Sequence, residues 1–411
     1  MLPKTYELDI GRIASELVID RKHIDFNIEL NLYQVSNIEI KNIPGDLLQT
    51  IPIAFENCKI LNCEFAYTDS CVCLFFANCS FACEVNIHYS LIDFIKFLNC
   101  IFYKPFTICS IVEQKVDFSN SHFKDYVDFR ACEFKKNASF YGTTFDKTPN
   151  FSQVIFKDSV NLVNIKANFD FENLNTAIKN IDKLIDETAN DFRDFFRTFK
   201  SVLIKDNNLL EASNFHKYEL YCKELELKNK KDKTFKDVVD RWQLFFYRKL
   251  CDHHTDILQS LNSLILAIGI FGVLNLATII GFNRYLGYKP ILEHLYFSLD
   301  FYNHHINSTI QDNYLFMIVV NLIMLFAYLI LVGFALCLKY MREFFITISY
   351  VITLFIMITS PKILIPAMGI FTDKRVMLDP LSVLGGIYTI VFGFVVYSFV
   401  KTIRKNSIVP S

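Results

Sequence analysis

Cysteine is the residue type with the clearest capacity for chemistry in this chain. Four thiolates can hold a structural zinc ion. Four of the twelve cysteines lie close enough together in the sequence for such a site: Cys71, Cys73, Cys79 and Cys83. Their spacing does not match the paired C-x₂-C knuckles of zinc sites. A disulfide framework is typical of short secreted proteins, whereas this chain has 411 residues. We therefore predict free thiols and no metal site, with zinc binding as the alternative.

Histidine could also bind a metal or sense pH. His304 and His305 belong to an aromatic stretch that also contains Glu293 and His294. Adjacent histidines between two apolar segments are more typical of a membrane surface, which is the interpretation we favour. The sequence contains no nucleophile–base set and no phosphate-binding loop. We expect a protein that is not an enzyme, with no catalytic residues and no cofactor.

The element that holds most of the cysteines has a regular spacing of bulky apolar residues. Between Phe118 and Leu162 the intervals are five and six residues in strict alternation. Neither a helix, with its period of 3.6, nor a strand, with its period of 2, produces this spacing. A chain that turns a corner about every five residues does, as in a square solenoid that sends one side chain per side to its axis. The predicted core residues are Phe118, Phe123, Phe129, Phe134, Phe140, Phe145, Phe151, Phe156 and Leu162.

The series continues upstream with less regularity. Its upstream members are Phe55, Ile60, Phe65, Phe75, Phe81, Ile87, Ile92, Phe97, Phe102 and Ile108. The residue two places before each core position is often small, because a narrow coil has room for one large side chain per side. Six cysteines occupy such positions: Cys58, Cys63, Cys73, Cys79, Cys100 and Cys132. We expect them to pack as buried free thiols.

The segments VDFSNSHF, ACEFKKNASFYGTTF and NFSQVIF resemble the pentapeptide-repeat family, whose unit is small, polar, large apolar and then two polar residues. The resemblance implies a β-solenoid over residues 51–172, a right-handed quadrilateral β-helix of parallel strands with about six coils. It covers a little under a third of the chain. Phe, Ile and Cys replace the family's Leu and Ala, so we expect the N-terminal coils to be irregular.

The segments on either side of the repeats lack this spacing of apolar residues. Residues 1–50 contain short β-like runs and are expected to form a cap or a degenerate first coil, because an open solenoid end exposes strand edges. Residues 173–257 are expected to form an α-helical connector. Apolar residues recur at helical spacing from 190 to 206, and a second helix is expected from Leu209 to about Lys228. This pair is similar to the helical hairpin that follows the repeats in membrane-bound members of the family.

A third connector helix, from Phe235 to about Cys251, has aromatic residues on one side and basic residues elsewhere. Such a helix next to a membrane segment is typical of the lipid headgroup level, with Trp242, Arg248 and Lys249 as the interface residues. The alternative is that it packs on the preceding helices. We place His253–His254 at the headgroup level as well.

Hydrophobic residues make up 52% of the chain, and the excess lies after residue 257. Residues 258–411 are expected to form a transmembrane domain with four α-helical spans, at about 258–282, 314–338, 344–364 and 381–400. Each is long enough to cross about 30 Å of hydrocarbon. Glycines 385, 386 and 393 suit close helix packing, within or between subunits. The polar residues Asn275, Thr278 and Asn321 are expected to form hydrogen bonds between helices.

Orientation follows from basic residues beside the spans. Three clusters lie on one side if both termini do: Arg241, Arg248 and Lys249; Lys339 and Arg342; Lys401, Arg404 and Lys405. The residues Lys362, Lys374 and Arg375 favour the opposite orientation weakly. The N-terminus lacks the features of a secretory signal. We expect a multi-pass protein of the bacterial inner membrane with cytoplasmic N- and C-termini.

The loop 283–313 contains an aromatic stretch that we interpret as an external interfacial helix. A re-entrant pore helix is the alternative, but the loop has no filter sequence of the TVGYG type. The solenoid is not acidic enough to imitate the phosphate backbone of DNA, because residues 50–172 contain fourteen acidic and eleven basic residues. We therefore expect no nucleic-acid partner.

Two hypotheses for function remain. The first is a scaffold whose cytoplasmic solenoid binds a cytosolic or membrane protein while the spans contact the lipid bilayer. The second is an oligomeric membrane pore or membrane-perturbing effector gated by the cytoplasmic part. Homo-oligomers are compatible with both.

Overall fold

The structure is a computed structural model that describes residues 6–65, 70–205, 207–289, 295–337, 339–359, 361–364 and 378–406. The chain forms two compact units, Met1–Arg241 and Trp242–Ser411. Each unit has its own hydrophobic core.

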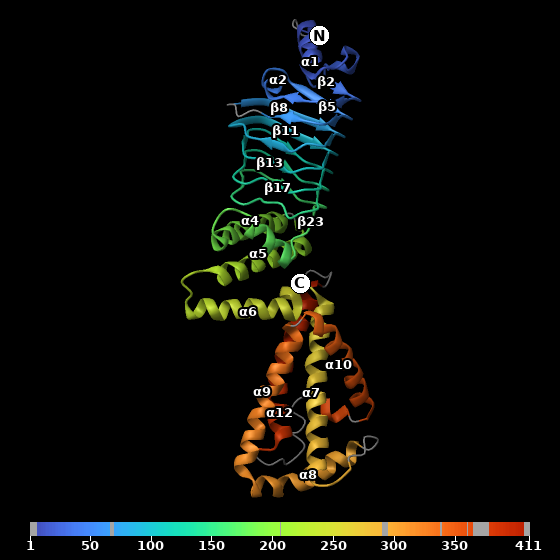
Figure 1. Ribbon diagram of the computed structural model, residues 1–411, viewed down its shortest axis with the longest axis vertical. Coiled ribbons are helices and arrows are strands. Elements are labelled where there is room, and N and C mark those ends of the chain that lie inside the picture. Colours follow the sequence, from blue (N-terminus) through green and yellow to red (C-terminus); the bar gives the residue numbers. More distant parts are fainter. Residues whose placement is uncertain are drawn as a thin grey trace. The chain divides into compact units, whose positions relative to one another are not determined.

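The first unit is built around a β-solenoid of short parallel strands stacked coil on coil (Figure 1). The partner of a strand residue lies 20 residues further on in the first coils, as for Glu39 and Lys59, and 22 further on in the last, as for Thr144 and Lys166. One column of the stack is the seven-stranded sheet β3-β6-β9-β12-β16-β20-β23, and a second runs through β2-β5-β8-β11-β14-β18-β21 within the eleven-stranded sheet. The predicted β-solenoid is confirmed.

The strands of the solenoid are β2 (Leu32–Ser36), β3 (Glu39–Ile40), β4 (Ile43–Pro44), β5 (Ile53–Glu56), β6 (Lys59–Ile60), β7 (Cys63–Glu64), β8 (Ser70–Ala77), β9 (Ser80–Phe81), β10 (Val85–Ile87), β11 (Leu91–Leu98), β12 (Ile101–Phe102), β13 (Phe106–Ile108), β14 (Ile111–Val112), β15 (Val116–Asp117), β16 (His122–Phe123), β17 (Val127–Asp128), β18 (Glu133–Phe134), β19 (Ala138–Ser139), β20 (Thr144–Phe145), β21 (Ile155–Phe156), β22 (Val160–Asn161) and β23 (Lys166–Ala167).

The alternation of five and six residues reflects two kinds of corner. Each five-residue interval after Phe118 contains one residue with a positive φ angle, and the six-residue intervals contain none. These residues are Asn120, Ala131, Gly142 and Gln153, and Asn164 has the same conformation two residues after Leu162. At the first of them the N–H of Ser121 donates to the carbonyl of Phe118 at 3.2 Å. A turn closed in this way, with a positive φ at its third residue, is a type II turn, which favours Gly or Asn there.

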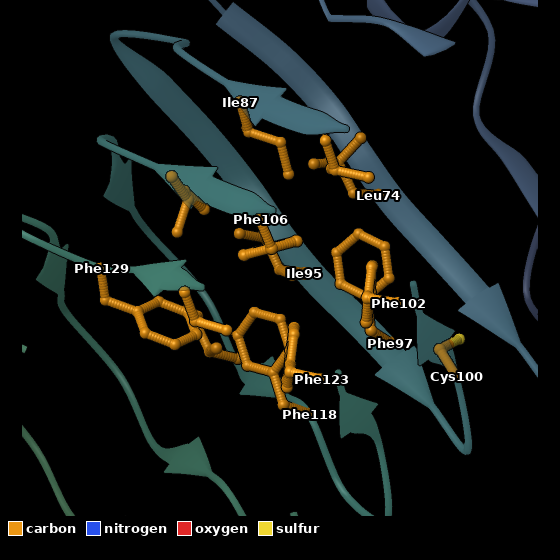
Figure 2. Packing of buried hydrophobic residues seen from close by; sticks show 14 of the residues in the cluster. Leu74, Ile87, Ile95, Phe97, Cys100, Phe102, Phe106, Phe118, Phe123 and Phe129 are labelled. Carbon is orange, nitrogen blue, oxygen red and sulfur yellow. The ribbon is translucent and has the colours of Figure 1, made fainter. Parts of the chain in front are cut away.

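The core of the solenoid consists largely of phenylalanine rings stacked face to face from coil to coil. Two columns are complete through the middle coils: Phe55–Phe76–Phe97–Phe118–Phe140 and Phe81–Phe102–Phe123–Phe145. Neighbouring rings are 4.5 to 5.6 Å apart between centroids and within 11° of parallel. Figure 2 shows the middle of both columns. Burial of one such side chain contributes about 1.5–3 kcal/mol, so the columns are a main source of the solenoid's stability.

The N-terminal end of the solenoid begins before residue 51. Helix α1 (Tyr6–Leu17) buries Ile10, Ile13 and Leu17 in the core of the first unit, and β1 (Ile24–Asn27) pairs antiparallel with β2. Strands β2, β3 and β4 pair in parallel with β5, β6 and β7 and so form a first coil. The short helix α2 (Gly45–Thr50) follows it.

One upstream core position predicted from the spacing is wrong by a single residue. Phe76 is fully buried, whereas Phe75 is half-exposed. The reason is that β8 and β11 are eight-residue strands that continue past a corner, and β11 pairs with both β14 and β15. The period of 2 therefore replaces the five-residue spacing within these strands.

Helices close the other end of the solenoid. They are α3 (Phe171–Lys179), α4 (Ile185–Lys205) and α5 (Leu209–Asn229), and Figure 1 shows α4 and α5 after the last coils. Phe195 of α4 lies 5.0 Å from the ring of Phe151 at an angle of 14°, which continues the stacking of the core onto the helix. Ion pairs join α4 to α5, including Lys200 with Glu219 and Arg193 with Glu226.

The second unit is helical. Its elements are the C-terminal part of α6 (Phe235–Cys251), the 3-10 turn η2 (Asp252–His254), α7 (Ile257–Tyr285), α8 (Leu295–Asp312), α9 (Tyr314–Cys337), α10 (Lys339–Thr359), the 3-10 turn η4 (Pro361–Leu364) and α12 (Pro380–Asn406). Four helical segments are long and apolar enough to cross a membrane: Ile257–Tyr285, Tyr314–Cys337, Arg342–Thr359 and Pro380–Asn406. The third helix ends at Thr359 rather than near Leu364, because Pro361 disfavours helix continuation.

Close packing in this unit involves glycines of α7. A Cβ on Gly269 or Gly272 would collide with Ser349 or Ile356 of α10. Positions 385, 386 and 393 of α12, which we expected to pack closely, have no neighbouring heavy atom within 4 Å of where a Cβ would be. Among the residues that the structure describes, nothing covers these three positions.

Two of the three polar residues expected to link helices make a hydrogen bond outside their own helix. The hydroxyl of Thr278 on α7 donates to the carbonyl of Leu274 and also lies 4.0 Å from Sδ of Met324 on α9. Asn321 on α9 donates to the carbonyl of Leu378, just before α12, at 2.8 Å. Asn275 instead donates to the carbonyl of Phe271 in its own helix. The hydroxyl of Tyr328 on α9, which we did not predict, also links two helices, because it donates to the carbonyl of Ala267 on α7 at 3.2 Å.

Candidate functional sites on the solenoid and at the membrane

The outer surface of the solenoid is ordered by the coil register into columns of side chains. Opposite charges in neighbouring coils often face each other: Lys59 with Glu39, Lys135 with Glu113, Lys157 with Glu133, Lys147 with Asp125, and His122 with Asp146. Most of these side chains are substantially exposed, so solvent screening leaves each pair little effect on stability. Their main effect is a hydrated surface with little net charge.

One column of the surface is aliphatic except for a single glutamate. The register places Leu91, Ile111, Glu133 and Ile155 in successive coils along β11, β14, β18 and β21. The three aliphatic residues are 37%, 36% and 47% exposed. Aliphatic side chains gathered on one rigid face are a candidate docking surface for another protein.

A cleft of about 540 Å³ lies between the last coils and α3. Tyr126, Asp128 and Arg130 contribute to one wall, and Asn173 and Asp182 to the other. The hydroxyl of Tyr126 donates to Asp128 at 3.2 Å, and burial raises its pKa to about 12. The mixed charges of this cleft suit a polar segment rather than an apolar ligand.

The cysteines of the solenoid lie where the repeat places them. The six on inward positions are buried. Cys79, for example, donates to the carbonyl of Phe55 in the preceding coil at 3.4 Å, and its pKa is raised to about 12. Among the residues that the structure describes, no group of three or more His, Cys, Asp or Glu could hold a metal ion. The side chain of Cys71 lies outside the described part.

The predicted solenoid core residues and interface residues are placed as follows. Seven of the eight predicted phenylalanines are buried, and Phe156 is half-buried against the core. Trp242 is 51% exposed and forms a ring cluster with Phe245 and Phe246 on α6. The guanidinium of Arg248 lies 5.5 Å from the centre of the Phe245 ring, and Lys249 is half-buried.

The two ends of α6 are held by side-chain contacts. At its start, Thr234 and Asp237 exchange hydrogen bonds as a capping box, and the nearby Lys230 lowers the pKa of Asp237. At its end, the amide of Gln259 donates to the carbonyls of Arg248 and Lys249, both at 2.8 Å. The last carbonyls of α6 are therefore satisfied by the first turn of α7.

The turn between α6 and α7 is strained and is held by the end of α12. Asp252, His253 and His254 all have positive φ angles, of 47°, 55° and 67°. Each costs about 1–2 kcal/mol for a residue with a side chain. Two α12 side chains donate to this turn: Lys405 to the carbonyl of His253 at 3.3 Å, and Asn406 to that of His254 at 3.2 Å. We call this set of contacts the α12 clasp.

The far end of the second unit contains α8. The hydroxyl of Tyr302, a fully buried residue of α8, donates to Asp379 at 2.7 Å, just before α12. The rings of His304 and His305 are perpendicular with centroids 4.8 Å apart. Glu293 and His294, which we considered with them, lie outside the described residues. Sequence reasoning missed the Tyr302–Asp379 contact, because a single Asp before a span gives no sign of its partner.

Comparison with known proteins identifies the repeats. Residues 118–165 match the family model described as pentapeptide repeats, in 9 copies. No curated protein and no solved structure gives a match. The matched segment coincides with the part of the solenoid in which fives and sixes alternate strictly. The chain therefore combines a pentapeptide-repeat solenoid with four helices that are long and apolar enough to span a membrane.

Proposed function

We propose that this chain is a non-enzymatic scaffold whose pentapeptide-repeat solenoid binds another protein. The observation that carries the proposal is the column of Leu91, Ile111 and Ile155 on one face of the solenoid. The stacked phenylalanine core makes that face rigid. A rigid surface loses little conformational entropy on binding, which favours affinity.

The membrane is the second part of the proposal. The first turns of α7 and α10 lie at the same end of the bundle, since Arg342 lies 3.5 Å from Ser263. The end of α12 joins them through Lys405 and His253. Basic clusters gathered at one end support a cytoplasmic placement of that end by the positive-inside rule. This supports a bacterial inner-membrane protein with both termini in the cytoplasm.

The interface helix α6 fits the same placement. Its exposed aromatic residues, including Trp242, suit the headgroup region, and Arg248 and Lys249 suit contact with lipid phosphates.

A photocrosslinking amino acid at Leu91 in the full chain tests the scaffold in cell membranes. We expect an adduct with a second protein, identified by mass spectrometry. The double substitution Ile111→Asp and Ile155→Asp should abolish it. Leu61→Asp is the matched control, because Leu61 is also 37% exposed but follows β6 in another sheet. An adduct that survives the double substitution and disappears in the control would contradict the proposed surface.

An oligomeric pore is the second candidate. The observation that favours it is the low burial of three spans, of which 22% of the apolar window is buried within one chain. The open glycines of α12 offer room for another copy. Purified protein in liposomes separates the two candidates: ion flux supports the pore, whereas sealed liposomes together with the crosslinked partner support the scaffold.

A further inference from the structure

Two thiols in successive coils lie against each other near the surface of the solenoid. The Sγ atoms of Cys63 and Cys83 are 3.5 Å apart. Cys63 belongs to β7 and is 8% exposed, and Cys83 lies in the bend before β10 and is half-exposed. We propose that this pair is a reversible oxidation site, which a hydroperoxide converts into a disulfide between two coils.

Neighbouring coils hold the two sulfur atoms in contact. Cys63 and Cys83 lie 20 residues apart, whereas the adjacent strands pair at an interval of 21, as for Ile60 and Phe81, so the two residues are offset by one position in successive coils. Their Sγ atoms are nonetheless only 3.5 Å apart. A disulfide has an S–S length of about 2.05 Å, so the sulfur atoms have to approach by about 1.5 Å.

The pair also provides the two unlike thiols that the chemistry requires. The hydrogen bond from Cys63 lowers the pKa of the Cys83 thiol below its ordinary value, whereas the same contact and then burial raise the pKa of Cys63. A thiolate is the reactive species toward peroxides. The more exposed member is thus also the better nucleophile.

Other stacked cysteines in the solenoid differ in both respects. Cys58, Cys79 and Cys100 also occupy equivalent positions in successive coils, but each is at most 2% exposed. Their Sγ atoms donate to backbone carbonyls of the preceding coil. The pKa of Cys79 is raised to about 12, so it remains a thiol at neutral pH. Stacking alone does not make a reactive pair.

The reaction is balanced in two steps. The Cys83 thiolate attacks one oxygen of hydrogen peroxide, the O–O bond breaks, and a sulfenic acid and hydroxide form. The Cys63 sulfur then attacks the Cys83 sulfur and displaces hydroxide, while its proton goes to water. In total, two thiols are oxidised to one disulfide and one peroxide molecule is reduced to two water molecules. A dithiol reductant reverses the reaction.

Mass spectrometry of the full chain in detergent tests the site. The protein is treated with hydrogen peroxide, its remaining thiols are alkylated, and it is digested with protease. We expect a peptide pair linked through Cys63 and Cys83 that disappears after reduction with dithiothreitol. In Cys63→Ser, a sulfenic-acid probe should label Cys83, whereas Cys83→Ser should leave Cys63 open to alkylation. Cys109→Ser is the matched control, because Cys109 is exposed and should not affect the linked pair.

The wild-type chain alone can overturn the proposal, so the test does not depend on folding of the variants. Oxidation of Cys109 without any linked Cys63–Cys83 peptide would contradict it. Linkage between Cys58 and Cys79 under the same conditions would contradict the argument from exposure.

Discussion

A phenylalanine in the stacked columns contributes more to the free energy of unfolding than an aromatic residue on the surface does. Phe123 is fully buried between the rings of Phe102 and Phe145, at 4.5 and 5.1 Å. Its replacement by alanine leaves a cavity that the stacked coils cannot close, because their spacing is set by backbone hydrogen bonds. We expect Phe123→Ala to lower the free energy of unfolding by about 3–5 kcal/mol. Thermal unfolding followed by the β-sheet signal in circular dichroism measures it.

The matched control for Phe123→Ala is Tyr141→Ala, because Tyr141 is 40% exposed on the same solenoid. It should change stability by about 0.5 kcal/mol or less. Equal losses for the two substitutions would mean that the columns do not stabilise the solenoid.

The positive φ angles at the corners of the solenoid predict opposite changes in stability for two small substitutions. Gly142 has a φ of +63°, and a Cβ there would collide with the side chain of Asn120 in the preceding coil. We expect Gly142→Ala to destabilise by about 2 kcal/mol or more. Ala131 has a φ of +59° in the equivalent turn, so Ala131→Gly should stabilise by up to about 1 kcal/mol. Chemical denaturation of both variants checks the signs, and a loss of stability in Ala131→Gly would contradict the strain.

These corners explain which residues the sequence places correctly. From Phe118 to Leu162 each five-residue interval contains one positive-φ corner and the six-residue intervals contain none, so the spacing alone determines the core. In β8 and β11 the strand continues past the corner, and Phe75 and Phe76 are both plausible inward residues by spacing. Hydrogen bonding between coils decides between them, and a single sequence does not contain that information.

At the level of elements, the α6–α7 turn is the clearest strained feature of the second unit. His254 is buried beside Thr402, with Nδ1 and Oγ1 3.1 Å apart, and next to Cys251. Burial lowers its pKa from 6.5 to about 4, and the charges of Lys401 and Lys405 add to the effect. A histidine with a lowered pKa is neutral when folded, so protons bind preferentially to the unfolded chain. The stability that neutral His254 allows is therefore present above pH 6.5 and is lost as the pH falls to 4.

We expect the melting temperature of the detergent-solubilised chain to fall between pH 6.5 and pH 4 partly through His254. The loss assigned to this residue is about 3 kcal/mol at most. His254→Gln keeps a polar side chain but does not titrate, so its melting temperature should fall less over the same range. If the two proteins lose stability in parallel, the buried histidine is not the cause.

Some helices can be predicted from the sequence and others cannot. The connector helices and four apolar helices were readable from periodicity and hydropathy, since a long uniform pattern leaves few alternatives. Helix α1 was not predicted, although Ile10, Ile13 and Leu17 recur at helical spacing. This spacing indicates a helix, although the β-like runs that follow it dominate the segment. The α12 clasp could not be predicted, because its contacts join His253 and His254 to Lys405 and Asn406, about 150 residues further along the chain.

At the level of the whole molecule, we propose that both termini lie on one side of the membrane, because the described residues contain four helices that are long and apolar enough to cross it. The basic clusters then decide which side that is. Labelling with a membrane-impermeant maleimide tests the choice in spheroplasts, with Asn307→Cys as the reporter on an exposed position of α8. We expect Asn307→Cys to react from outside, whereas the exposed Cys109 of the solenoid reacts only after permeabilisation. Cys109 in the same protein is the internal control for membrane integrity, because both thiols are accessible to solvent and differ only in compartment. Labelling of Cys109 in intact spheroplasts, with Asn307→Cys protected, would reverse the orientation and would place the solenoid outside the cytoplasm, where a cytosolic partner could not reach it.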